Sequence, residues 1–477
     1  MRKTKIVCTM GPATKSRETL SRLIDAGMDI ARLNFSHGTH EQHLTTIQSI
    51  RDVAREMKRT VAILLDLQGP KLRTGLISNG CVELKKGKRI SITIDDVPGT
   101  KDLISTSYKY LAKDVRPGDM ILLDDGLIQL QTLEVEDNIV HCRILEGGML
   151  SDHKGINLPN VDISQPSLTS KDRKDLEFGI EHAVDFIALS FVRRAADVKD
   201  LKKILTSKNS DAMVIAKLEK PEAINDLDNI LDETDGVMVA RGDLGVEVPL
   251  EKVPSLQKQI IRKAMCRGVP VITATQMLES MRDHARPTRA EVSDVANAIF
   301  DGTDAVMLSA ETAVGNYPIE TVTMMRNIIN EAEKEFSTSA SDWDPNPDEA
   351  DSISDAISKS ACEAAEQLNA KAIVAFSKSG FTARMVSKYR PDTSLIAFTP
   401  SEVVQRQLNL SWGVNPLTME FLNNTEDIVL RTEEILLSSK IVRKGDIVVV
   451  LMGAPIFVHG TTNLMKLHVV GEGAKRS

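Results

Sequence analysis

The feature that most constrains the fold of this chain is a repeated alternation of short β-branched runs with segments of helical period. Units of this kind are typical of a parallel sheet covered by helices. Strands are expected at residues 5–8, 29–33, 61–66, 184–190, 213–218, 236–240, 270–274 and 305–308. Helices are expected at 18–25, 40–57, 171–182, 196–205, 222–231, 255–266 and 289–300, followed by a last long helix that ends near residue 336.

Eight such units fit a closed (β/α)₈ barrel, a TIM barrel, better than an open doubly wound sheet. The alternation is interrupted over residues 69–167, where short runs such as RISITID and NIVHCRIL are separated by Gly, Asp and Lys turns. This segment predicts a small β-barrel domain. Because it follows the third strand, it lies on the catalytic rim, where a lid would sit. The barrel is therefore assigned to residues 1–68 and 168–340.

A second α/β region follows the barrel. The Ser/Asp/Pro-rich stretch 337–350 is interpreted as a linker. Beyond it, helices are expected at 353–368, 382–389 and 426–437, with strands at 372–376, 395–398, 446–451 and 467–470. This pattern predicts a separate C-terminal domain of open α/β type at 350–477.

Composition excludes several classes of protein. The net charge of -8 and an aromatic content of 4% give no reason to expect a nucleic acid or an anionic membrane as partner. No apolar run reaches the roughly 20 residues of a membrane helix, and the first residues do not form a secretory signal. The five scattered cysteines favour neither disulfides nor a zinc site. We therefore expect a cytoplasmic enzyme of several domains.

Polar side chains follow most of the expected barrel strands, at the end where active sites of such barrels lie. Apolar runs that end repeatedly in charge are unlikely by chance. The residues are Arg32, Asn34, Ser36 and His37 after the second strand, Asp66 after the third, Lys217 and Glu219 after the fifth, Arg241, Gly242 and Asp243 after the sixth, Thr275 and Gln276 after the seventh, and Ser309 and Glu311 after the eighth.

Two carboxylates from neighbouring strands, Glu219 and Asp243, could share a Mg²⁺ ion that keeps several waters and accepts phosphate oxygens. The alternative is an ion-pair network on the rim. Lys217 and Arg32 supply the positive charge that phosphoryl transfer needs, and Gly242 would expose backbone N–H groups to an anion. No GxxxxGKT or GxGxxG motif occurs, so a nucleotide would be held in another way.

Several long motifs in the right order resemble pyruvate kinase of the bacterial type over essentially the whole chain. They are RLNFSHG (32–38), LDLQGPKLR (65–73), KGINLP (154–159), MVARGDLGVE (238–247), ITATQMLESM (272–281), RPTRAEVSDVANA and MLSAET. The resemblance implies a (β/α)₈ barrel, a mobile lid and a regulatory domain, usually in a homotetramer. It also implies the conversion of phosphoenolpyruvate and ADP to pyruvate and ATP with Mg²⁺, for which Mn²⁺ could substitute.

The resemblance also implies roles for individual residues. Glu219 and Asp243 match the metal ligands, and Lys217 matches the lysine that stabilises the transferring phosphoryl group. Arg32 matches the phosphate-binding arginine, and Thr275 and Ser309 match a relay that protonates the enolpyruvate. The matches for substrate-carboxylate contacts are Gly242, Asp243 and Thr275, and those for nucleotide contacts are Arg73 and Lys154, with Asn34 and His37 nearby.

The chain departs from many family members at two positions. Those members carry Thr and Glu where this chain has Leu67 and Lys71, and they bind K⁺ against the residues that match Asn34, Ser36 and Asp66. We predict that Lys71 replaces the potassium ion, which would place the chain in a potassium-independent subgroup.

A further loop resembles the effector phosphate loop of the family. Ser377, Lys378, Ser379, Gly380 and Thr382 lie between a strand and a helix, where hydroxyls and a lysine could hold the phosphate of a sugar phosphate or nucleotide. An ordinary capped turn is the alternative.

Two other functions compete with the kinase hypothesis. A non-catalytic metabolite-binding protein would not need both carboxylates together with the lysine. A metal-dependent barrel lyase or aldolase acting on pyruvate enolates would share the enolate chemistry, but would not account for the lid or for Arg73 and Lys154.

Overall fold

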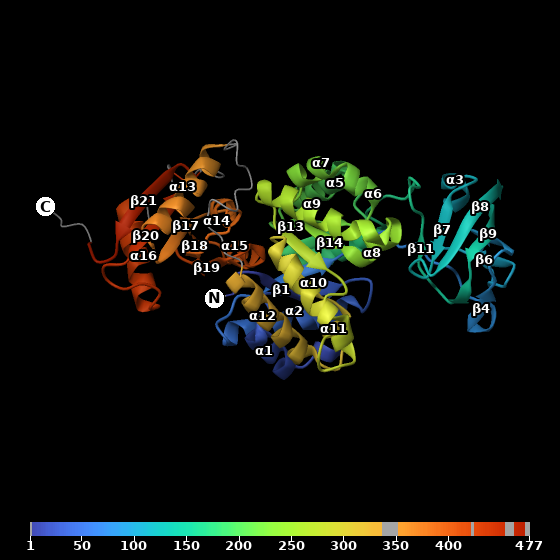
Figure 1. Cartoon of the computed structure of the whole chain (residues 1–477), viewed down its shortest axis with the longest axis horizontal. Helices are drawn as coiled ribbons and strands as arrows, with labels where there is room; N and C mark the ends of the chain where they lie inside the picture. The colour runs from blue at the N-terminus through green and yellow to red at the C-terminus, as the bar shows by residue number, and fades with distance from the viewer. Residues whose placement is uncertain (1, 336–351, 421–423, 454–461, 473–477) are drawn as a thin grey trace.

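The computed structural model describes residues 2–335, 352–420, 424–453 and 462–472. Figure 1 shows three parts in a row, with the barrel in the middle, an all-β domain at one end and the C-terminal α/β domain at the other. The expected linker at 337–350 lies outside the described residues. Within the described part of the chain, no helix combines the length and the apolar sequence that a membrane span requires.

The central part is a closed barrel of parallel strands, as the alternation predicts. Its strands follow one another around the barrel in chain order, and β3 pairs with β12 across the inserted domain, with Leu64 opposite Phe186. The strands are β1 (Lys5–Thr9), β2 (Ile30–Asn34), β3 (Ala62–Asp66), β12 (Phe186–Leu189), β13 (Met213–Leu218), β14 (Gly236–Ala240), β15 (Val271–Ala274) and β16 (Ala305–Leu308).

Successive residues of each strand face opposite sides, and both sides are apolar. In β3, Leu64 points into the barrel interior, while Ile63 and Leu65 pack against the surrounding helices. Burial on both faces explains why these strands appear in the sequence as continuous apolar runs. The helices are α1 (Arg17–Ala26), α2 (His40–Glu56), α4 (Ser170–Glu181), α5 (Ala195–Ser207), α6 (Pro221–Asn225), α7 (Leu227–Glu233), α8 (Arg241–Glu247), α9 (Val253–Cys266), α10 (Arg289–Phe300), α11 (Ala310–Ala313) and α12 (Pro318–Glu335).

Two helical predictions differ from the structure. The single helix expected at 222–231 is divided into α6 and α7 at Asp226, whose backbone (φ -101°, ψ 18°) leaves the helical region. Helix α8 was not predicted, because it starts directly at the end of β14 and contains two glycines, which weaken a helical pattern. This short helix carries Gly242 and Asp243.

The lid domain forms its own core from a curled six-stranded sheet and a two-stranded ribbon. It also contains one short helix, α3 (Leu111–Asp114), which the sequence pattern did not indicate. The sheet order is β11 (Ile156–Asn157), β7 (Met120–Leu123), β8 (Ile128–Glu136), β9 (Ile139–Glu146), β5 (Arg89–Thr93) and β6 (Leu103–Ser105), and the ribbon pairs β4 (Cys81–Leu84) with β10 (Gly148–Ser151).

The C-terminal domain is an open sheet with apolar cores on both faces. Strand β19 was missed because it contains Pro416, and helix α15 was missed because it is only 6 residues long. The sheet order is β19 (Val414–Thr418), β18 (Ser394–Thr399), β17 (Ala372–Phe376), β20 (Ile447–Met452) and antiparallel β21 (Leu464–Val469), with α13 (Ile353–Gln367), α14 (Phe381–Ser387), α15 (Glu402–Gln407) and α16 (Thr425–Ser438).

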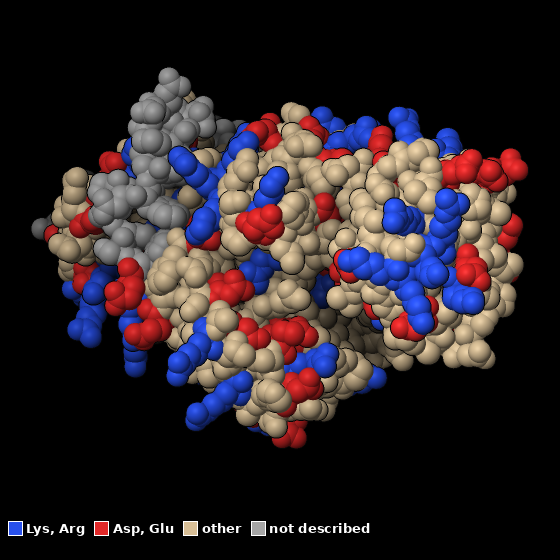
Figure 2. All heavy atoms as spheres, turned by 45° about the vertical axis from the view of Figure 1, so that its right-hand side comes forward, with Lys and Arg blue, Asp and Glu red and all other residues tan. Residues whose placement is uncertain are grey.

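This domain closes the end of the barrel where the strands begin. Leu410 packs among the apolar residues of the barrel interior, and Arg390 forms an ion pair with Asp304, just before β16. The opposite end faces the lid. Figure 2 shows the surface hollowed between barrel and lid, with Lys and Arg side chains gathered on the lid face turned toward the viewer. The net charge of -8 therefore does not describe this face of the lid.

Candidate active site at the barrel mouth

A network of charges centred on Asp66 occupies the mouth of the barrel. Asp66, at the end of β3, is bonded through Oδ2 to Arg32 Nε (2.7 Å) and through Oδ1 to Lys217 Nζ (3.1 Å). Lys217 also contacts Glu219 Oε1 at 2.9 Å. The exposed fraction of each of these four side chains is 11% or less. Barrel closure therefore brings together three strand ends that the sequence analysis had singled out separately.

The network sets the protonation of its members. Burial opposes the charge of Asp66, yet Lys217 and Arg32 hold the pKa of this carboxyl below its usual range. Burial likewise opposes the charge of Lys217, but Asp66 and Glu219 raise its pKa above the ordinary value. Lys217 is therefore an ammonium group at neutral pH. A fixed cation in a poorly hydrated mouth can stabilise the negative charge that develops during phosphoryl transfer.

Glu219 differs from Asp66, because its pKa is raised rather than lowered. Burial raises the pKa of Glu219 to about 7, Lys217 opposes this rise, and the charge of Asp243 adds to it. Two neighbouring carboxylates that resist joint ionisation are suited to a divalent cation, which would relieve their repulsion. No cluster of three or more His, Cys, Asp or Glu residues that could hold a metal is found among the described residues. Two protein ligands fit Mg²⁺, which usually keeps several waters and binds substrate phosphates.

The turn after β15 holds a strained backbone. Thr275 has φ 70° and Gln276 has φ 54°, and the left-handed region is a clear outlier for a β-branched residue. Arg241 fixes this turn, because its Nη2 donates to Thr275 O at 2.7 Å while its Nη1 pairs with Asp294 at 2.7 Å. Strain of this kind concentrates at functional sites. Here it aims Thr275 Oγ1 at the first turn of α8, where Oγ1 accepts a hydrogen bond from Gly242 N at 2.8 Å.

Ser309 lies at the end of β16, next to β15 in the barrel. It precedes α11, and its backbone N–H donates to Glu311 Oε2 at 2.6 Å. The other oxygen of the buried Glu311 accepts from Leu278 N at 3.2 Å. Glu311 therefore holds the loops after β15 and β16 together, and Ser309 shares the mouth with Thr275.

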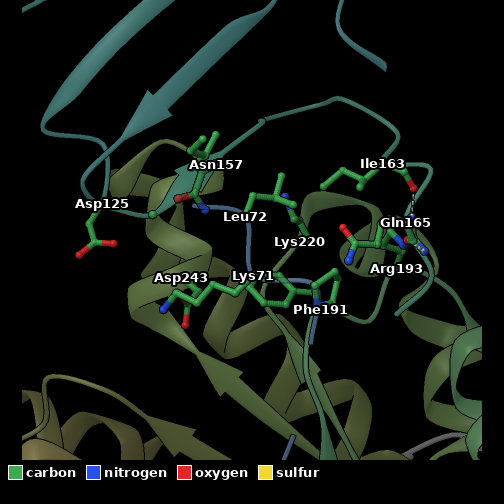
Figure 3. Close-up of a pocket in the computed structure, with 13 residues that line it drawn as sticks. Lys71, Leu72, Asp125, Asn157, Ile163, Gln165, Phe191, Arg193, Lys220 and Asp243 are labelled. Atoms are coloured by element: carbon green, nitrogen blue, oxygen red, sulfur yellow. Dashed lines mark hydrogen bonds between the residues drawn. The ribbon is translucent and has the colours of Figure 1, made fainter. Parts of the chain in front are cut away.

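A cleft between the lid and the barrel mouth lies next to this network (Figure 3). Asp243 and Lys71 point toward the same end of it, and Asn157 of the lid lies above them. The cleft is lined by residues of the lid hinge, of the lid and of the loops after β12, β13 and β14: Pro70, Lys71, Leu72, Asp125, Gly155, Ile156, Asn157, Ile163, Gln165, Phe191, Arg193, Lys220 and Asp243.

The residues expected at the nucleotide come from both sides of the molecule. Arg73 donates to His153 O at 2.8 Å, and Lys154 Nζ pairs with Asp124 at 2.8 Å, so these two cations lie close together on the lid. Asn34 is the last residue of β2 on the barrel side, where its Oδ1 accepts from Ser36 N at 3.1 Å. His37 is exposed in the next turn.

Lys71, expected to supply the positive charge in place of a potassium ion, lines the cleft between lid and barrel. Its side chain is exposed in the cleft, and among the described residues no ion pair joins it to Asp66, whose two oxygens face Arg32 and Lys217. Asn34 and Ser36 lie near Asp66, since Asn34 and Asp66 are opposite each other in the register of β2 and β3.

The sequence analysis missed several residues that shape the mouth. Ser190 Oγ lies 2.8 Å from Lys217 Nζ, and Thr9 Oγ1 accepts from Arg32 Nη1 at 3.0 Å. Phe191, with φ 54°, turns its backbone N–H toward Glu219 Oε2 at 2.8 Å. Ser190 and Thr9 both end barrel strands, so a strict survey of every strand end would have found them.

The loop expected to bind an effector lies at the other end of the molecule, after β17. Ser377 and Thr382 are buried, and Ser377 Oγ accepts from Thr382 N at 3.3 Å. Thr382 Oγ1 lies 2.8 Å from Thr462 Oγ1. Gly380 adopts φ 78°, where a side chain would be strained and would collide with Arg384. Lys378 is exposed.

Comparisons with known proteins agree with this architecture. Residues 1–322 match the family model described as pyruvate kinase, barrel domain, and residues 355–468 match pyruvate kinase, alpha/beta domain. The chain is 48% identical to pyruvate kinases of Staphylococcus epidermidis and Staphylococcus aureus, over 99% of this chain and 81% of each relative. A crystal structure of a pyruvate kinase from Cryptosporidium parvum superimposes with a TM-score of 0.93 at 39% identity, covering 98% of this chain and 96% of that one. The chain belongs to the pyruvate kinase family.

Proposed function

We propose that the mouth of the barrel transfers the phosphoryl group of phosphoenolpyruvate to ADP and then protonates the resulting enolpyruvate to pyruvate. The observation that carries this proposal is the Asp66 network, which presents Arg32 and Lys217 beside the carboxylate pair of Glu219 and Asp243. Curated pyruvate kinases at 48% identity make a barrel lyase, an aldolase or a purely binding protein the weaker explanations.

Glu219 and Asp243 would hold Mg²⁺, which supplies Lewis-acid stabilisation of phosphate oxygens when bound. Lys217 would stabilise the transferring phosphoryl group, and Arg32 would bind the phosphate of the substrate. Both cations are anchored by Asp66, so they are oriented before the substrate arrives.

The first turn of α8 would receive the substrate carboxylate. Backbone N–H groups there, at Gly242 and Asp243, are donors suited to an anion, and Thr275 Oγ1 accepts from the N–H of Gly242. Thr275 and Ser309, on adjacent strand ends, would pass a proton to the methylene carbon of enolpyruvate. Phosphoryl transfer leaves an enolate, and its protonation makes the overall reaction favour ATP.

ADP would bind in the cleft under the lid. Arg73 and Lys154 would contact its phosphates from the lid, with Asn34 and His37 on the barrel side. The pairing of Lys154 with Asp124 is partly exposed and therefore weak, so a phosphate can compete for the lysine.

We further propose that the enzyme does not require potassium, because Leu67 removes a hydroxyl ligand and Lys71 brings a fixed ammonium group to the cleft. Lys71 would move toward the substrate when the lid closes. The test measures ATP formation from phosphoenolpyruvate, ADP and MgCl₂ in tetramethylammonium buffer, with and without KCl. No ATP in either buffer would refute the kinase function, whereas ATP only with KCl would refute the role of Lys71.

The proposal extends to regulation and assembly. The loop that contains Ser377, Lys378, Ser379, Gly380 and Thr382 would bind the phosphate of a sugar phosphate or nucleotide, with the exposed Lys378 as the cation. A homotetramer and a cytoplasmic location are expected from the family. Activity at low phosphoenolpyruvate, measured with a series of sugar phosphates and nucleoside monophosphates, tests the loop, and sedimentation tests the tetramer.

A further inference from the structure

A buried ion pair stands directly beside the proposed metal carboxylates and is not used by the roles above. Lys220 Nζ lies 2.6 Å from Glu247 Oε1, and the two side chains are only 4% and 1% exposed. Lys220 follows Glu219 in the chain. Glu247 is the last residue of α8, one helical turn after Asp243. Each member of the pair is therefore attached to the element that carries one of the two metal carboxylates.

The backbone around this pair has little freedom. Lys220 is extended (φ -122°, ψ 145°) before Pro221, and a residue that precedes proline is restricted to this region. Residues four apart on a helix lie on the same side, so Asp243 and Glu247 share one face of α8. The ion pair thus connects the end of β13 to the face of α8 that carries Asp243.

The lid contributes a third member. Asn157, in the lid strand β11, donates from Nδ2 to the same Glu247 oxygen at 2.9 Å. Asn157, Lys220 and Asp243 all line the cleft between lid and barrel, as Figure 3 shows. Glu247 Oε1 is therefore a point at which the strand end, the helix and the lid meet.

Neither stability nor charge accounts for a lysine at this place. A buried ion pair is weak support for stability, because desolvation of the two charges offsets their attraction. A lysine next to a metal site also opposes metal binding by Coulomb repulsion. The remaining explanation is geometric, since partners beyond the direct ligands orient those ligands and tune metal affinity.

We propose that Lys220 and Glu247 are positioning residues that fix the separation of Glu219 and Asp243, and that Asn157 connects this pair to the lid. The proposal rests on the proposed function, because it takes Glu219 and Asp243 as the metal ligands.

The test uses Mn²⁺ as probe and measures its dissociation constant from the full-length enzyme by electron paramagnetic resonance of free Mn²⁺, without substrates. Glu247→Gln keeps an acceptor of the same length for Lys220 and Asn157 but removes the charge, whereas Glu247→Ala removes both. We expect Glu247→Ala to raise the dissociation constant roughly tenfold or more, and Glu247→Gln to change it much less. Equal weakening in both variants would show that charge matters rather than position, and would overturn the proposal.

A second pair of variants separates position from repulsion. If Lys220 acted only through its charge, the double variant Lys220→Met/Glu247→Gln would bind Mn²⁺ as tightly as Glu247→Gln or more tightly. The positioning role predicts weaker binding than in Glu247→Gln, because the link between the strand end and α8 is lost. This comparison also keeps the proposal testable if Glu247→Ala does not fold.

The matched control is Lys388→Met. Lys388 is an equally buried lysine, 2% exposed, whose ion pair with Asp355 lies in the C-terminal domain. This variant should lower the thermal unfolding midpoint but leave Mn²⁺ affinity unchanged.

Asn157→Leu tests the contribution of the lid. This variant should raise the KM for ADP several-fold without changing Mn²⁺ binding, and an unchanged KM would show that the lid has no part in the proposal.

Different variants test the metal site and the positioning role separately. If Glu219→Gln and Asp243→Asn leave Mn²⁺ binding intact, the assigned metal site is wrong and the proposed function loses its metal. If these two variants weaken Mn²⁺ binding while Glu247→Ala does not, the metal site stands and the positioning role is refuted.

Discussion

The two ends of the barrel both contain buried ion pairs, but they use them differently. At the base, Asp304 is saturated: Oδ1 accepts from Arg390 Nη1 at 2.9 Å and from Trp412 N at 3.2 Å, and Oδ2 accepts from Val271 N at 2.9 Å. Leu410 fills the adjacent barrel interior. The ion pair at the base is therefore enclosed, and both oxygens of Asp304 are bonded to protein donors, although Arg390 Nε has no hydrogen-bond partner among the described residues.

At the mouth, the charges are close together but incompletely balanced. Asp66 is saturated by two cations, yet Glu219 and Asp243 repel each other, and Asp243 lines the cleft. The same types of side chain thus serve stability where the protein supplies the partners of the carboxylate, and chemistry where a partner of the carboxylates is left to the ligand. The following variants test this distinction, beginning with the largest expected effect.

The largest effect is expected for Lys217→Met at the mouth. Loss of the ammonium group should lower the rate of ATP formation roughly 10²–10³-fold, because charge developing on the phosphoryl group is no longer stabilised. The fold should persist, since Asp66 keeps its bond to Arg32. Protonation of enolpyruvate, followed by exchange of the methyl protons of pyruvate, should continue. Loss of both activities would contradict the role given to Lys217.

At the base, Arg390→Met should act on stability rather than on rate. It leaves Asp304 buried without its cation, which should cost about 3–5 kcal/mol. We expect a lower midpoint of urea unfolding and an unchanged kcat per folded molecule. The double variant Arg390→Met/Asp304→Leu should recover part of the loss, since a buried pair can often be replaced by apolar residues. A fall in kcat at an unchanged unfolding midpoint would contradict the distinction between stabilising ion pairs at the base of the barrel and catalytic charges at its mouth.

Lys71→Glu should create a potassium requirement at the mouth. The variant exchanges a fixed cation for a carboxylate, so ATP formation without potassium should fall by roughly 10²-fold, the typical cost of one electrostatic contact in an active site. Adding KCl should restore much of this loss. Lys71→Met, which removes the charge without offering a potassium ligand, is the control and should not be rescued. Rescue of both variants would argue against direct replacement of the ion by Lys71.

The smallest effect is expected for Lys3→Met, also at the base. Lys3 lies over the Trp412 ring at 4.9 Å and pairs with Asp392, whose side chain is 67% exposed. An exposed pair of this kind contributes about 0–1 kcal/mol. The urea midpoint should therefore move far less than in Arg390→Met. A comparable shift of the urea midpoint would mean that burial does not distinguish ion pairs that contribute strongly to stability from pairs that contribute little at this end of the barrel.

Much of the fold could be predicted because its signals are local. Helix α10 (Arg289–Phe300) was placed correctly, and the structure shows a local signal at its start, where Thr288 and Glu291 form a capping box. The barrel strands were found because burial on both faces makes them continuous apolar runs. Helices α8 and α15 were missed because they are short, and short helices depend on tertiary contacts more than on their own sequence.

The candidate site was predicted less completely than the fold. Arg32, Asp66, Lys217 and Glu219 were recognised as strand ends, and the structure brings them into one network. The role of Lys71 as a substitute for the potassium ion stays a prediction, and the structure places this lysine in the cleft between lid and barrel. Lys220 was passed over, since nothing in the sequence near position 220 identifies Glu247 as its partner.

The sequence by itself determined the order of strands and helices, the interruption by a β domain, and the polar residues that end the strands. These follow from periodicity and from turn residues, which act over a few positions. Only the tertiary structure decided which of those residues touch. The bond between Lys217 and Asp66 joins residues 151 positions apart, and the bond from Asn157 to Glu247 spans 90. Such contacts exist because a closed barrel brings every strand end to one mouth, and no local pattern records that closure.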